Sequence, residues 1–132
     1  LPQKVVWPVH PRTRKMMEVN EISCKDNVIL TLPFSYLDMI LFLKNASLVL
    51  TDSGGVQKEA MFFETPCVTL RPETEWIETL DSGWNLLSKI DAEQILKTVE
   101  VHSSTPKKNP EQVYGTGQSA DKVVTAILSY LN

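Results

Sequence analysis

Short apolar segments alternate with helix-forming segments along most of the chain, and this alternation limits the folds that the sequence can adopt. The apolar segments are typical of buried strands and span residues 4–9, 27–32, 47–51, 66–71 and 84–87. The helix-forming segments span residues 12–20, 36–46, 56–63, 91–101 and 120–131. Residues 102–118 are polar and contain proline and glycine, so we expect them to be mostly loop. The alternation predicts an α/β fold with a doubly wound, Rossmann-like parallel sheet.

Length and charge point to one ordinary globular domain without a nucleic-acid partner. The chain has 132 residues and a net charge of -3, whereas nucleic-acid binding calls for a basic surface. No apolar run approaches the roughly 18 residues of a membrane span, and no basic start followed by an apolar core indicates a secretion signal. Cys67 lies in the apolar string "CVTL", which favours a buried reduced thiol over a disulfide or a metal ligand. We therefore expect a cytoplasmic protein.

Chemically capable residues follow four of the predicted strands. These strands end at "HPRTR", "LPFSY", "TDSGG" and "RPETE", which lie in that order along the chain. In an open parallel sheet, ligands bind beyond the carboxyl ends of the strands. We therefore expect the binding site at this edge of the sheet.

The strongest single candidate is the pair Gly54 and Gly55, placed between a strand and a helix. A helix N-terminus offers unpaired N–H groups and a positive dipole end, which suit a phosphate, and Ser53 adds a hydroxyl. Glu59 lies one helical turn after Gly55, where a carboxylate could accept hydrogen bonds from ribose hydroxyls. The alternative is a tight turn capped by Ser53. The GxxxxGK[ST] and GxGxxG motifs are absent.

Other candidates at this edge also allow two interpretations. His10 could meet a phosphate or transfer a proton, or it could be structural. Arg12 could bind phosphate or simply begin an exposed helix, and Arg71 with Glu75 could form only a local ion pair. Phe34 could stack on a base or pack in the core. The residues alone assemble no catalytic set and no metal-ligand cluster.

Four motifs together resemble the C-terminal half of the non-hydrolysing UDP-N-acetylglucosamine 2-epimerase family. They are "PVHPRTRK", "TDSGGVQKEA", "TPCVTLRPETEWIETLDSGWN" and "YGTGQSADKVV", and they occur in the family's order over nearly the whole chain. The resemblance implies the glycosyltransferase-B architecture, in which two Rossmann-like domains face each other and the C-terminal one holds UDP. It also implies that UDP-GlcNAc becomes UDP-ManNAc by elimination and re-addition of UDP, without a metal or nicotinamide cofactor.

The resemblance assigns roles to individual positions. Ser53, Gly54 and Gly55 would bind the diphosphate, Glu59 the ribose, and the backbone around Pro33 and Phe34 the uracil. His10 would lie near the diphosphate and have a catalytic role. The expected UDP site therefore consists of His10, Arg12, Pro33, Phe34, Ser53, Gly54, Gly55, Glu59, Arg71 and Glu75.

The chain departs from the family pattern at "TEWIE", residues 74–78, where many members have Thr-Glu-Arg-Pro-Glu. Trp76 and Ile77 thus replace an Arg-Pro pair, which resembles the branch that epimerises modified sugars such as UDP-diacetamido-glucuronic acid. A histidine of the family's allosteric site would fall at Ile40, so we expect no such regulation.

The family's acid and base carboxylates belong to an N-terminal domain, which this chain does not contain. We therefore expect residues 1–132 to be a UDP-binding domain that is inactive alone. Its final helix, about residues 119–132, is expected to pack on the missing domain, and the parent protein is expected to form a homodimer.

Two rival functions stay open at this point. One is the nucleotide-sugar-binding half of a glycosyltransferase with the same architecture. The other is a regulatory module that binds a nucleotide without catalysis.

Overall fold

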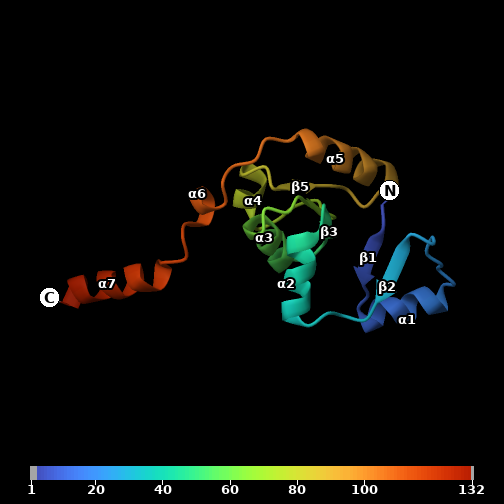
Figure 1. Cartoon of the computed structure of the whole chain (residues 1–132), viewed down its shortest axis with the longest axis horizontal. Helices are drawn as coiled ribbons and strands as arrows, with labels where there is room; N and C mark the ends of the chain where they lie inside the picture. Colours follow the sequence, from blue (N-terminus) through green and yellow to red (C-terminus); the bar gives the residue numbers. More distant parts are fainter. Residues whose placement is uncertain (1–2, 132) are drawn as a thin grey trace. The chain divides into compact units, whose positions relative to one another are not determined.

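The computed structural model describes residues 3–131, which divide after Asn45 into two compact units (Figure 1). The first unit contains β1 (Val5–Pro8), α1 (Pro11–Val19), β2 (Val28–Thr31) and α2 (Tyr36–Asn45). The second unit begins with β3 (Val49–Thr51), α3 (Gly54–Phe62), β4 (Cys67–Thr69), α4 (Ile77–Asp81) and β5 (Asn85–Leu87). It continues with α5 (Ala92–Ser104), α6 (Glu111–Tyr114) and α7 (Ser119–Leu131).

The first unit is built on a β-α-β arrangement. β1 and β2 pair in parallel, with Val5 opposite Val28 and Pro8 opposite Thr31. α1 begins with a proline, whose missing N–H costs nothing at a first helical position. The Arg14 guanidinium donates a hydrogen bond of 3.2 Å to the carbonyl oxygen of Thr31. This bond attaches α1 to the carboxyl end of β2.

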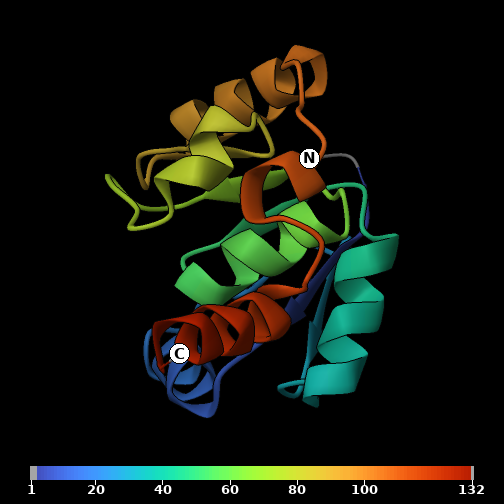
Figure 2. The same ribbon diagram turned by 90° about the vertical axis from the view of Figure 1, so that its left-hand side faces the viewer.

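The second unit contains a parallel sheet in the order β3-β4-β5. All three residues of the central strand β4 are buried, so "CVT" does not show the alternation of buried and exposed residues that is typical of a strand with one solvated face. Both α3 and α5 contact β4, and they cover opposite faces of the sheet (Figure 2). Ala60 and Met61 of α3 are completely buried and form the core together with Cys67 and Val68.

The structure confirms the predicted α/β class with parallel strands, and each predicted strand segment contains one of the strands. Two short helices were not predicted, namely α4 and, within the expected loop, α6. Each has no more than five residues, which is too few to show a clear helical period in the sequence. α4 is stabilised by the Thr79 hydroxyl, which donates a hydrogen bond of 2.7 Å to the Trp76 carbonyl oxygen. α5 also extends beyond residue 101, to Ser104.

Cys67 and His102 are two chemically capable residues that the fold buries. Burial raises the pKa of the Cys67 thiol to about 12, so this group stays protonated at neutral pH. His102 is 1% exposed, and its Nε2 lies 3.0 Å from the Trp84 carbonyl oxygen. Neither side chain is available to a ligand at the surface.

α7 differs from the other long helices because none of its described residues is buried. Its apolar side chains include Val123, Val124 and Ile127, each at least 54% exposed. Among residues 3–131, no helix has the length and apolar character that crossing a membrane requires.

Candidate functional site

The first turn of α3 is the centre of the candidate site. Ser53 precedes the helix in an extended conformation, and its side chain makes no capping hydrogen bond. Its backbone N–H donates instead to the Thr51 hydroxyl at 3.0 Å. The geometry of an α-helix leaves its first N–H groups without acceptors inside the helix, so these donors face the space before Gly54. The alternative of a turn capped by the Ser53 hydroxyl is therefore not what the structure shows.

Neither glycine is required for its backbone conformation, and only Gly54 is required for space within the chain. Positive φ angles occur at Gly83, Gly115 and Gly117 but not at Gly54 or Gly55. A Cβ atom on Gly54 would meet the Glu75 carboxylate and the Trp76 indole nitrogen, whereas one on Gly55 would meet no atom within 4 Å. Gly54 thus permits a close contact inside the chain.

No contact within the second unit explains why residue 55 is a glycine. Glycine in a helix is less favourable than alanine by about 0.5–1 kcal/mol. Here it leaves an open surface directly beside unpaired N–H donors, which is the arrangement that a phosphate needs.

The segment after β4 lies against this helix start. Arg71 and Glu75 form an exposed ion pair with an N–O distance of 3.3 Å, as one of the two interpretations from the sequence allowed. The Lys58 ammonium group lies 3.5 Å from the centre of the Trp76 ring. The Trp76 Nε1 is buried and has no hydrogen-bond partner among the described residues. Positive charge and an unused donor therefore accompany the α3 N-terminus.

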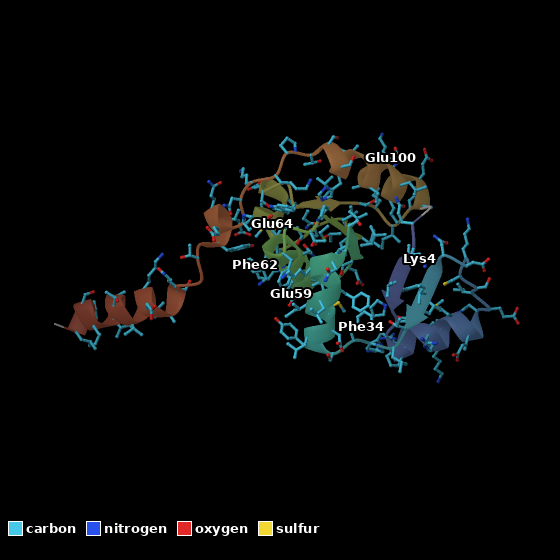
Figure 3. The ribbon with its side chains drawn as sticks, viewed as in Figure 1. Lys4, Phe34, Glu59, Phe62, Glu64 and Glu100 are labelled. Carbon is cyan, nitrogen blue, oxygen red and sulfur yellow. The ribbon has the colours of Figure 1, made fainter. Side chains whose placement is uncertain are left out.

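The second unit thus brings together most of the predicted site. β3 and β4 end at the same edge, since Thr51 pairs with Thr69, and this edge carries Ser53, Gly54, Gly55, Arg71 and Glu75. Glu59 follows on α3 and is half-buried (Figure 3). The sequence did not single out Lys58 as a neighbour of this site. Its contact with Trp76 depends on how α3 packs and could not be read from spacing.

The remaining predicted residues belong to the first unit. His10 caps α1, where its Nδ1 accepts a hydrogen bond from the Arg12 backbone N–H at 3.2 Å. Both side chains are exposed, and so is Pro33. The Phe34 ring stacks on Phe42 with 4.2 Å between the ring centres, which matches the packing interpretation of its side chain (Figure 3). Its backbone is the part for which the family resemblance implies a role.

Comparison with known proteins identifies the family. The family model described as UDP-N-acetylglucosamine 2-epimerase matches residues 2–128. The chain belongs to this family. A Methanococcus maripaludis protein named UDP-N-acetylglucosamine 2-epimerase homolog is 43% identical over 95% of the chain and 36% of its own length. The UDP-2,3-diacetamido-2,3-dideoxy-D-glucuronate 2-epimerase of Pseudomonas aeruginosa is 42% identical over 90% of the chain and 33% of its own length.

Solved structures of family members share the fold. The Methanocaldococcus jannaschii UDP-GlcNAc 2-epimerase, solved in complex with UDP-GlcNAc and UDP, aligns with a TM-score of 0.77 and 37% identity. The alignment covers 95% of this chain and 35% of that protein. The glycosyltransferase-B-like fold class predicted from the sequence is thereby confirmed. The chain spans about a third of the length of the 2-epimerases that it matches.

Proposed function

We propose that this chain is the UDP-binding part of a UDP-N-acetylglucosamine 2-epimerase, whose complete form interconverts UDP-GlcNAc and UDP-ManNAc. The observation that carries the proposal is Gly55, which leaves an open surface at a helix N-terminus for no reason internal to its unit. A diphosphate matches this surface, because N–H donors and the helix dipole both favour an anion. Family membership supports the same ligand.

Each predicted residue has a role in this proposal. Backbone N–H groups of the first turn of α3 and the Ser53 hydroxyl bind the diphosphate, and Glu59 accepts hydrogen bonds from the ribose. Arg71 supplies positive charge at the same edge and is held by Glu75 at 3.3 Å. In the first unit, the roles of His10 and Arg12 at phosphate, and of Pro33 and Phe34 at uracil, stay predictions from the family resemblance. His10 also keeps its predicted catalytic role.

The sugar of the substrate has a second candidate. The relative from Pseudomonas aeruginosa is named for a diacetamido-glucuronate sugar and is 42% identical to this chain. Trp76 and Ile77 stand where many family members carry an Arg-Pro pair, and the Lys58 ammonium group lies 3.5 Å from the centre of the Trp76 ring. A cation beside the diphosphate site also suits a sugar that bears a carboxylate. UDP is common to both candidates.

The chain alone is expected to be catalytically inactive, since the relatives that it matches are about three times longer. We propose that α7 uses Val123, Val124 and Ile127 to pack against a domain of the complete protein, and that the complete protein forms a homodimer. A coupled assay for UDP-ManNAc, run with this chain and UDP-GlcNAc, should detect no turnover. Measurable turnover by the chain alone would contradict this expectation.

UDP binding is tested by calorimetric titration of this chain. We expect saturable binding, and Glu59→Ala should weaken it about tenfold or more because the ribose hydroxyls lose a charged acceptor. The matched control is Glu100→Ala on α5, an exposed helical glutamate on the other face of the sheet, which should bind UDP like the wild type (Figure 3). Absence of binding at millimolar UDP, or equal effects of the two substitutions, would contradict the proposal.

A further inference from the structure

The Thr74 hydroxyl connects the segment after β4 to α3. It donates a hydrogen bond of 2.6 Å to the Gln57 Oε1, and it accepts one of 3.1 Å from the Trp76 backbone N–H. One hydroxyl group therefore fixes the segment to the helix and also shapes the turn that leads to Trp76. Thr74 itself is partly buried, between the exposed residues Glu73 and Glu75.

Gln57 is held by the protein interior. Its side chain is completely buried, and its Oε1 also accepts a hydrogen bond of 3.1 Å from the Asn85 Nδ2. Asn85 is buried as well, accepts from the Thr69 hydroxyl at 2.8 Å and donates to the Thr79 hydroxyl at 3.0 Å. The Gln57 Nε2 has no hydrogen-bond partner among the described residues, so the side chain is held through its oxygen, which accepts from both Thr74 and Asn85. Gln57 thus gives Thr74 a fixed attachment point.

The attached segment forms one wall of the proposed diphosphate site. Glu75 and Trp76 lie so close to Gly54 that a single methyl group there would meet both side chains. Lys58, one residue after Gln57, lies over the Trp76 ring. The position of this segment therefore decides where a carboxylate and an indole N–H stand relative to the first turn of α3.

We propose that Thr74 and Gln57 are positioning residues for nucleotide binding, and that their hydrogen bond holds the Glu75–Trp76 wall at the distance from α3 that a diphosphate requires. The proposal rests on the UDP-binding function proposed above. Neither residue needs to touch the ligand, since Gln57 is buried and Thr74 acts through the two residues that follow it. A wall fixed in advance raises affinity because binding no longer has to order it.

The test compares three variants of the chain by UDP titration and urea unfolding. Thr74→Val keeps the shape of the side chain but removes the hydroxyl, and it should weaken UDP binding about tenfold. Thr74→Ser restores the hydroxyl and should bind UDP within about twofold of the wild type. Thr69→Val removes a hydroxyl from the buried far end of the same network, so it should lower the urea midpoint without changing UDP affinity.

The outcomes separate this proposal from the function on which it rests. If the wild type binds UDP and only Thr74→Val binds it more weakly, the positioning role is supported. If the wild type and Thr74→Val bind UDP equally well, the positioning role is overturned and the UDP site stays intact. Equal losses for Thr74→Val and Thr69→Val would also overturn it, because affinity would then follow general stability. If the wild-type chain binds no UDP, both proposals fail together.

Discussion

Gly55→Trp is expected to reduce the affinity of the chain for UDP at least about a hundredfold while leaving its stability nearly unchanged. The Cβ of any residue at this position would meet no atom within 4 Å, so a larger side chain can leave the helix here without a backbone shift. Tryptophan is also a better helix former than glycine, and the free energy of unfolding should change by no more than about 0.5 kcal/mol. The indole would instead cover the N–H donors of the first turn of α3.

The expected size of this loss follows from the bonds that the indole blocks. A hydrogen bond to a charged group contributes roughly 1.5–3 kcal/mol, and a hundredfold loss of affinity corresponds to about 2.7 kcal/mol. Calorimetric titration with UDP measures the affinity, and urea unfolding measures the stability. Ala92→Trp, at the exposed first position of α5, is the matched control and should bind UDP normally. Unchanged affinity of Gly55→Trp would place the nucleotide elsewhere.

Much of the fold could be predicted from the sequence because its strands are short, apolar and separated by helical periods. "PCVTLR" contains the fully buried β4, and its apolar character has no other simple explanation. α4 could not be predicted in this way, since a helix of five residues has no measurable period. The Thr79 hydroxyl stabilises it by bonding the Trp76 carbonyl oxygen, an interaction that exists only once the chain has folded.

The candidate site also contains residues that a local sequence pattern predicts and residues that only the folded chain brings together. Ser53, Gly54, Gly55 and Glu59 are close in sequence, so a strand followed by a helix is enough to place them together. Gln57 and Asn85 looked like ordinary polar residues, yet both are completely buried. Gln57 bonds Thr74 and Asn85, which lie 17 and 28 residues away along the chain. No local sequence pattern signals such distant hydrogen bonds. The ligand proposed for the site comes from the family resemblance, whereas the interactions that support the geometry of the site are visible only in the structure.

Asn85→Leu is expected to lower the free energy of unfolding by about 3 kcal/mol, although it makes the core more apolar. Asn85 uses its oxygen to accept from the Thr69 hydroxyl and its nitrogen to donate to Gln57 and Thr79. Leucine has the same branched arrangement of side-chain heavy atoms but a larger volume, so it removes all three bonds and adds some overpacking. Each polar group left without a partner in the interior costs roughly 1–3 kcal/mol, and part of that cost is offset because Gln57 keeps its bond from Thr74.

This substitution separates two explanations of how the sheet is held to its helices. If apolar burial alone stabilised the second unit, the transfer of leucine from water at this completely buried position would offset the strain of its larger volume, and the substitution would be close to neutral. If the polar network stabilises it, urea unfolding should show a large loss, comparable with that of a cavity substitution such as Met61→Ala in the same core. An unchanged or higher urea midpoint would mean that Asn85 and Gln57 contribute little to stability, and that the network serves chiefly to orient the residues around α3.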